Sequence, residues 1–185
     1  MEIVKTSIEG LVILKPMVYQ DERGYFFESF KNSFIKENFN DINFIQDNES
    51  KSKYGVLRGL HFQKPPFEQT KLVRVIEGEV LDVAVDLRKN SSTYGKHESF
   101  ILSSENKKQL IIPKGFAHGF VVLSEIAVIS YKVDANYAPE FDSGLFYGDE
   151  NLDIDWILHK SELIISQKDI NLQSFIEFEG LDETF

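Results

Sequence analysis

The chain has 185 residues, 42% of them hydrophobic, which is the length and composition of one globular domain with a sizeable core. Its formal net charge of −10 predicts that neither nucleic acid nor a membrane is a partner, because an acidic surface repels nucleic acid and anionic lipid. The lack of cysteine excludes disulfides and thiolate metal sites, and without a secretory signal pattern or a membrane-length apolar run we expect a cytoplasmic protein.

Short apolar segments separated by turn signals recur along the chain, which is typical of an all-β sandwich or barrel. We expect strands over 12–14, 24–30, 44–48, 56–63, 71–76, 80–88, 98–102, 109–112, 119–123 and 126–133. Helices are few: one over 32–39, with Phe34, Ile35 and Phe39 as its apolar face, and another short one from Leu152 onward. We therefore predict a single domain, 1–185, folded as a jelly-roll (cupin-like) barrel, with an acidic surface tail over 178–185.

The clearest strand is 80–88, because apolar and charged residues alternate along it with a period of two. One face carries the apolar residues and the other the charged ones: Leu81, Val83, Val85 and Leu87 against Asp82, Asp86 and Arg88. The preceding segment, 71–76, is separated from it by a turn centred on Gly78. Such a turn between two strands predicts an antiparallel hairpin.

Two of the four histidines stand in unusual settings. His61 lies within the apolar segment 56–63 and is expected to point into the barrel. His118 ends the pattern P-x-G-x-x-H, which resembles the second histidine motif of metal-binding cupins. The first motif of those proteins has two histidines two residues apart, but here the second is Gln63. Because zinc and iron sites need three or four protein ligands, we expect no metal.

Without a metal, His61 is either a hydrogen-bonded core histidine or a general base, for which a neutral imidazole is well suited. Arg58 and Lys71 are close to it in sequence and flanked by apolar residues. Each alone could be a surface charge, but two cations near such a histidine in an acidic protein favour an anion site. Strict alternation puts Arg58 and His61 on opposite faces of the strand, so this grouping requires a β-bulge at Gly59.

Tyr131 shares the parity of Ala127 and Ile129 in the segment 126–133, so all three lie on one face of the strand. A tyrosine in such a place usually packs in the core. It is also a candidate proton donor on the opposite side of a cavity from a base. Position alone leaves both interpretations open.

Short motifs along the chain have the order and spacing of one enzyme family. They are 21–26 (DERGYF), 46–48 (QDN), 55–63 (GVLRGLHFQ), 71–75 (KLVRV), 82–86 (DVAVD), 112–120 (IPKGFAHGF), 131–132 (YK), 137–140 (YAPE) and 165–169 (ISQKD). On these motifs the chain resembles the dTDP-4-dehydrorhamnose 3,5-epimerases over nearly its whole length.

The resemblance implies a jelly-roll homodimer, often formed by exchange of N-terminal strands, that works without a metal or cofactor. It implies the substrate dTDP-4-dehydro-6-deoxy-D-glucose, inverted at both carbons that flank the ketone. It implies that His61 is the base, Asp169 its carboxylate partner, Lys71 the cation by the C4 oxygen and Tyr131 the acid. Residues that fall where the family binds the nucleotide sugar, some of them from the partner subunit, are Arg23, Glu28, Gln46, Asn48, Arg58, His118, Tyr137, Asp142 and Lys168.

The chain departs from the family pattern at three places near the sugar or nucleotide end: Asp142 stands where many members have glutamate, Ile157 where proline is common, and 146–148 (FYG) where a tryptophan–acid pattern is usual. Relatives with the same catalytic residues invert only one carbon, so a single-centre epimerase is the alternative function. A non-catalytic sugar-nucleotide-binding protein would lack one of the four catalytic residues. A metal-dependent cupin fails on ligand count.

Overall fold

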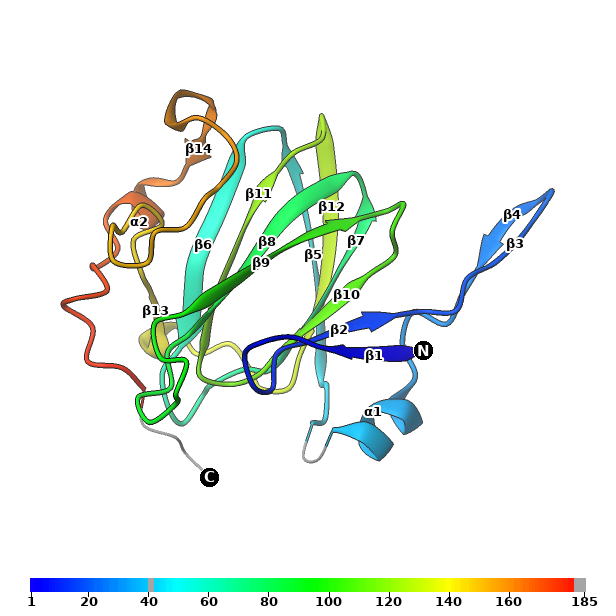
Figure 1. Cartoon of the computed structure of the whole chain (residues 1–185), viewed down its shortest axis with the longest axis horizontal. Coiled ribbons are helices and arrows are strands. Elements are labelled where there is room, and N and C mark those ends of the chain that lie inside the picture. Colours follow the sequence, from blue (N-terminus) through cyan, green and yellow to red (C-terminus); the bar gives the residue numbers. More distant parts are fainter. Residues whose placement is uncertain (40–41, 182–185) are drawn as a thin grey trace.

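The computed structural model describes residues 1–39 and 42–181, which form two facing β-sheets and a projecting hairpin (Figure 1). Sheet one has, in spatial order, β1 (Glu2–Lys5), β2 (Val12–Lys15), β10 (Gln109–Ile112), β7 (Lys71–Glu77), β12 (Ile126–Val133) and β5 (Gln46–Lys53). Sheet two has β13 (Asp142–Gly144), β6 (Val56–Gln63), β11 (Phe116–Val122), β8 (Glu79–Asp86) and β9 (His97–Ser103), with β14 (Ile164–Ile165) parallel to β6. The predicted all-β jelly-roll barrel is confirmed.

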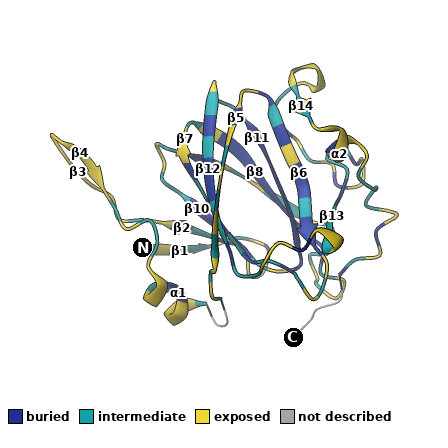
Figure 2. Ribbon diagram, turned by 180° about the vertical axis from the view of Figure 1, so that it is seen from behind, coloured by how far each residue is buried: buried dark blue, intermediate teal, exposed yellow. Residues whose placement is uncertain are grey.

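The hydrophobic core lies between the two sheets and continues on both outer faces (Figure 2). Inward-facing residues of the two sheets, such as Val73 and Ala84, pack together in the interior. The predicted apolar face of strand 80–88, formed by Leu81, Val83, Val85 and Leu87, packs instead on the outer side of sheet two against the C-terminal segment. The alternation is thus confirmed, and it means that the charged face of β8 looks into the barrel.

Helix α1 (Asn32–Asn38) covers the outer face of sheet one, with Ile35 buried among Leu14, Leu72 and Ile111, as the predicted helix over 32–39 requires. The helix expected from Leu152 does not form. That stretch makes turns up to a short 3₁₀ helix, η2 (Lys160–Glu162), because Asp149 accepts a hydrogen bond from the backbone N–H of Asn151 and so competes with helical bonding. The remaining helices are η1 (Pro139–Phe141) and α2 (Gln167–Ile170).

The predicted hairpin around Gly78 is wrong, because β7 and β8 belong to different sheets. A single residue joins them, one fewer than the common hairpin turns use, and the chain crosses from sheet one to sheet two at this point. Gly78 takes a positive φ of 80°, and a Cβ there would collide with the carbonyl oxygen of Ile126. Only glycine fits this crossing.

Three predicted segments have different bounds or surroundings. The strand over 24–30 stops at Phe26, because Phe30 turns away to pack edge-on against Phe44 beneath α1. The strand predicted over 44–48 is β5, which begins at Gln46 and continues to Lys53 along β12. Two residues of the expected surface tail are buried: Phe178 contacts Phe62 and Leu181 is 5% exposed, because they cover the outer apolar face of sheet two, while Glu179 between them is exposed. Residues 182–185 of that tail lie outside the described residues.

The hairpin β3 (Tyr19–Asp21) and β4 (Gly24–Phe26) extends away from the two sheets (Figure 1), and every one of its strand residues is exposed. Within the described ranges, no helix is long and apolar enough to cross a bilayer.

Candidate active site

A cavity of about 630 Å³ opens between the two sheets, which is within the usual size of a small-molecule site. Its walls come from both sheets, from the loop before β13 and from α2. The four predicted catalytic residues line it together with part of the predicted substrate-binding set: His61, Lys71, Tyr131, Asp169, Arg58, His118, Tyr137, Asp142 and Lys168. The structure therefore brings these segments to one place.

A β-bulge at Gly59 places both Arg58 and His61 in this cavity. In the pairing of β6 with β11, His61 lies opposite His118 and Arg58 lies opposite Phe120, so β6 has one residue more than its partner over this stretch. Gly59 has a φ of 129°, and a Cβ on it would lie 2.5 Å from the Cα of Gly119. The bulge that the grouping requires is present, and it needs glycine at this position.

His61 is paired with Asp169, whose Oδ1 lies 2.7 Å from His61 Nε2. Ser166 begins α2 and its hydroxyl accepts from the Asp169 N–H, which fixes the short helix that carries the carboxylate. With Nε2 donating to Asp169, Nδ1 is the nitrogen free to accept a proton. Burial lowers the pKa of His61 more than Asp169 raises it, so the imidazole is neutral at pH 7. Its side chain is 32% exposed, and that surface faces the cavity.

Lys71 enters from β7 and donates from Nζ to the backbone oxygen of His61 at 3.4 Å. Burial lowers its pKa to about 8, opposed by the nearby carboxylates of Asp82 and Asp142. Below that pH the group is an ammonium ion inside the cavity. This places a cation close to His61.

Tyr131 stands on β12 of sheet one, whereas His61 stands on β6 of sheet two, and both line the same cavity. Burial raises the pKa of the phenol, while the charge of Arg58 acts to lower it. The phenol is therefore protonated at neutral pH and available as an acid. The imidazole of His61 and the phenol of Tyr131 thus reach the cavity from opposite walls.

His118 is buried in the cavity wall and held by Asp82, whose two carboxylate oxygens each lie 3.0 Å from His118 Nε2. Asp82 is fully buried on the inner face of β8, and the sequence analysis did not single it out as part of the site. The signal was present: Asp82 is an acid in a buried strand, diagonal across the β8–β11 pair from His118.

At the mouth of the cavity, Asp142 joins Tyr137 and Lys168. Its Oδ2 accepts from the Tyr137 hydroxyl at 3.1 Å and lies 2.5 Å from Lys168 Nζ. The bond to Asp142 raises the pKa of Lys168. This cluster is polar and open, as expected of the end that receives a charged ligand.

Gln46 and Asn48 lie beside the cavity on the inner face of β5, joined by a 2.8 Å hydrogen bond. Asn48 is opposite Tyr131 in the β5–β12 pairing. Other residues that line the cavity were not singled out from the sequence: Ser50, Gln69, Ile164, Ile165 and Ser166. Small polar residues alternate with charged ones along 46–53, a period-two pattern without apolar residues that could have revealed this wall.

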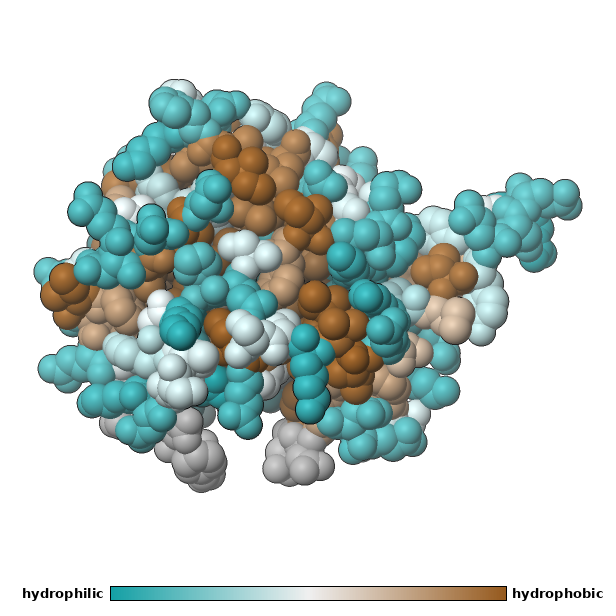
Figure 3. Space-filling view, in the orientation of Figure 1, coloured by the Kyte–Doolittle hydropathy of each residue, from teal (hydrophilic) through white to brown (hydrophobic). Residues whose placement is uncertain are grey.

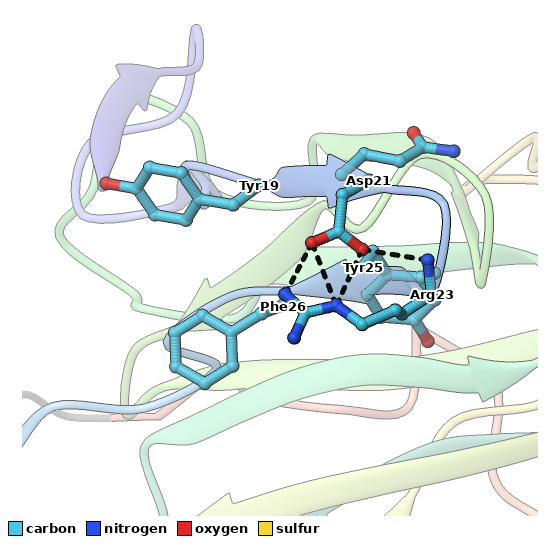
Figure 4. Close-up of a pocket in the computed structure, with 7 residues that line it drawn as sticks. Tyr19, Asp21, Arg23, Tyr25 and Phe26 are labelled. Carbon is cyan, nitrogen blue, oxygen red and sulfur yellow. Dashed lines mark hydrogen bonds and ion pairs between the residues drawn. The ribbon is translucent and has the colours of Figure 1, made fainter.

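Arg23 and Glu28 lie apart from the cavity of their own chain. Arg23 sits at the tip of the hairpin, 86% exposed, and its guanidinium pairs with Asp21 (Figure 4). Glu28 follows β4 and contacts Lys31 at 3.8 Å. Neither residue reaches the cavity of its own chain in this conformation. Each would contact a bound ligand only after the hairpin moves, or in the cavity of another copy of the chain.

Gln63, at the position of the missing cupin ligand, is used by the fold: its amide donates to Phe67 O and accepts from Ala138 N. Across residues 1–39 and 42–181, no three His, Asp or Glu side chains are grouped so as to hold a metal ion.

Comparison with known proteins identifies the family. The model of the dTDP-4-dehydrorhamnose 3,5-epimerase family matches residues 5–177. The dTDP-4-dehydrorhamnose 3,5-epimerase of Methanothermobacter thermautotrophicus is 53% identical over 169 residues, 91% of each chain. The crystal structure of dTDP-6-deoxy-D-glucose-3,5-epimerase from Legionella pneumophila, in complex with dTDP-4-keto-L-rhamnose, aligns with a TM-score of 0.93 and 45% identity over 100% of this chain and 98% of the other. A 3'-monoepimerase of Streptomyces bikiniensis aligns with a TM-score of 0.85 and 30% identity over 91% and 85% of the two chains. The chain belongs to the dTDP-4-dehydrorhamnose 3,5-epimerase family.

Proposed function

We propose that this protein converts dTDP-4-dehydro-6-deoxy-D-glucose to dTDP-4-dehydro-L-rhamnose in dTDP-L-rhamnose biosynthesis by inverting C3 and C5. The observation that carries the proposal is one cavity with a neutral imidazole on one wall, a phenol on the other and an ammonium group beside the imidazole. Family membership supports the same reaction. The nucleotide and the exact sugar come from the relatives, not from the cavity alone.

The arrangement suits proton transfer next to a ketone. His61 takes the proton from the carbon through Nδ1, and Asp169 stabilises the imidazolium that results. Charge moves to the ketone oxygen, where the Lys71 ammonium stabilises the enolate. Tyr131 then delivers a proton from the opposite face, which inverts the centre. Only protons are exchanged, so the reaction needs no electron acceptor.

Proton NMR in deuterated water tests the proposal. With dTDP-4-dehydro-6-deoxy-D-glucose as substrate, we expect deuterium to replace hydrogen at both C3 and C5, with inversion at each. The single-centre alternative, supported by the similarity to a 3'-monoepimerase, predicts inversion at one carbon only. No exchange at either carbon would contradict both functions.

Tyr131→Phe separates the acid from the base in the same assay. We expect inversion to fall at least ~10²-fold, the usual contribution of a general acid. Exchange at the carbon should continue, because His61 still removes the proton and returns deuterium to the same face. Inversion at the normal rate in this variant would rule out Tyr131 as the acid.

We also propose that the protein is a cytoplasmic homodimer in which each hairpin reaches the cavity of the partner subunit. Large side chains on the hairpin are exposed, namely Tyr19 at 64%, Tyr25 at 57% and Phe26 at 67%, and contiguous exposed apolar side chains commonly mark an interface. In Figure 3, hydrophilic residues cover the free tip of the hairpin and hydrophobic ones gather nearer its base. This arrangement would bury the apolar base between subunits and bring Arg23 to the diphosphate.

Mixed dimers test this exchange. Arg23→Ala alone should raise KM roughly tenfold or more, because a charge-assisted contact to an anion is lost. When Arg23→Ala and His61→Ala subunits are coexpressed with different tags, the purified mixed dimer contains one site with both intact residues. Measured at substrate concentrations far below KM, about half of the normal kcat/KM should return, because the one site with His61 also has an intact Arg23 from the partner. If the mixed dimer instead keeps the raised KM of Arg23→Ala, Arg23 does not serve the partner's cavity.

A further inference from the structure

The inner face of the edge strand β5 is polar along its whole length, and one of its residues holds a charged side chain. Gln46, Asn48, Ser50 and Ser52 face inward, while the residues between them are exposed. Ser52 is only 7% exposed. A buried hydroxyl needs a hydrogen-bond partner, and that of Ser52 accepts from Arg58 Nε at 3.1 Å.

This hydrogen bond links the two sheets across the cavity wall. Ser52 belongs to sheet one and Arg58 to sheet two, and the chain passes between them through the turn at Gly55. The bulge at Gly59 already directs Arg58 into the cavity. A bond through Nε fixes the long side chain along the wall while both Nη groups stay free for other partners.

Arg58 is close enough to Tyr131 for its charge to act on the phenol. Both side chains line the same cavity, and the guanidinium opposes the effect of burial on the pKa of Tyr131. A phenol that donates its proton becomes an anion in a half-buried site. A positive charge already fixed nearby stabilises that anion without rearrangement.

We propose that Ser52 is a positioning residue: its hydroxyl holds the Arg58 guanidinium inside the cavity, where it stabilises the phenolate left when Tyr131 delivers its proton. This rests on the proposed function, because Tyr131 must act as an acid. It gives Arg58 a part in the proton transfer in addition to any contact with the diphosphate.

Other ionisable groups line the same cavity, so the test must isolate Arg58. From the barrel strands the ionisable groups are His61, Lys71 and His118, and from the rim and α2 they are Tyr137, Asp142, Lys168 and Asp169. The inner face of β5 adds none. Removal of the Ser52 hydroxyl leaves all of these groups in place and frees only Arg58.

The experiment is a titration of Tyr131 in the unliganded protein. Ultraviolet difference spectra record phenolate formation, and subtraction of Tyr131→Phe isolates its signal from the six other tyrosines among the seven in the chain. In Ser52→Ala we expect the pKa of Tyr131 to rise by roughly half a unit to one unit. Ser52→Thr, which keeps the hydroxyl, should restore the original pKa.

Ser130→Ala is the matched control. Ser130 is equally buried and also gives up a hydrogen bond, to Asp47 at 3.0 Å, but it lies on the other face of the same strand pair. Its removal should leave the pKa of Tyr131 unchanged. If Ser52→Ala does not fold, Ser52→Cys keeps the volume and weakens the hydrogen bond, and the same rise is expected.

Arg58→Met completes a double-mutant cycle. It should raise the pKa of Tyr131 at least as far as Ser52→Ala, and the double variant should rise no further than Arg58→Met alone. An unchanged pKa in folded Ser52→Ala, or additive shifts in the double variant, would overturn the inference. Because no substrate is present, this result is independent of the deuterium-exchange assay, which tests the proposed function separately.

Discussion

His61→Ala is expected to abolish epimerisation while the barrel and dTDP binding stay nearly intact. The loss of a general base typically costs ~10²–10⁴ in rate, and Asp169 already orients the neutral imidazole of His61 in the cavity. His118, the second histidine there, has both oxygens of fully buried Asp82 on its Nε2 and stands deeper in the wall. Its side chain is only 9% exposed, against 32% for His61, so it offers a bound substrate much less surface.

A second substitution separates chemistry from folding. Alanine at position 61 leaves Asp169, 3% exposed, without its imidazole partner, which costs stability. His61→Gln can donate to Asp169 but cannot accept a proton from carbon. We expect it to restore thermal stability and leave the rate as low as in His61→Ala. Exchange at C3 and C5 is read by NMR, binding of dTDP by calorimetry and unfolding by circular dichroism.

The matched control is His97→Ala, because His97 begins β9 and lies outside the residues that line the cavity. Its activity should be normal.

The acid side of the pH profile provides a further check on His61. Since the pKa of His61 is lowered, the neutral base persists below pH 6.5, and kcat/KM should decline only at a lower pH than an ordinary histidine would give. Near-normal turnover in His61→Gln would show that His61 is not the general base.

The sequence was sufficient for the barrel because its inner strands alternate or are continuously apolar, and this periodicity survives in the structure. It failed where one residue changes the path of the chain. Gly78 sends the chain to the other sheet, whereas the bulge at Gly59 could be named in advance only because Arg58 and His61 were grouped together. Period-two patterns predict neither the place of a bulge nor which strand becomes the neighbour, because those depend on close backbone contacts formed only after folding.

Some polar residues of the site could be predicted from the sequence and others could not, because a polar residue is noticeable only where its neighbours form a clear pattern. His61, Lys71 and Tyr131 stand in apolar strands, where a polar residue is conspicuous. Ser52 stands in a strand without any apolar residue, so only the alternation of small polar and charged residues marks its inner face. Asp169 and Lys168 lie on a four-residue helix, far too short for a periodic signal, and only the family resemblance indicated them.

Lys71→Met should lower the rate by at least ~10²–10³, the usual cost of losing one group that stabilises the developing oxyanion. Methionine fills similar space without a charge. The pKa of Lys71 is lowered from 10.5 to about 8, so the folded protein disfavours the ammonium form; this penalty is complete below about pH 8 and fades as the pH rises toward 10.5. The methionine variant should therefore be at least as stable as the original at pH 7. A loss of both rate and stability would mean that Lys71 has a structural role instead.

The alkaline limb of the pH profile provides the sharper test of the same residue. Only the ammonium form can stabilise an enolate, so kcat/KM should fall as the pH rises through about 8. Tyr131 would give a limb above pH 10, since its pKa is raised from that value, and the two are distinguishable. Lys71→Arg keeps a positive charge at every accessible pH and should move the limb from about 8 toward that of Tyr131, even at a reduced maximal rate. Lys51→Met, on the exposed face of β5, is the control and should leave the profile unchanged. If the alkaline limb stays near pH 8 in Lys71→Arg, a group other than Lys71 is titrating there. That group, and not Lys71, would then be the cation that stabilises the enolate.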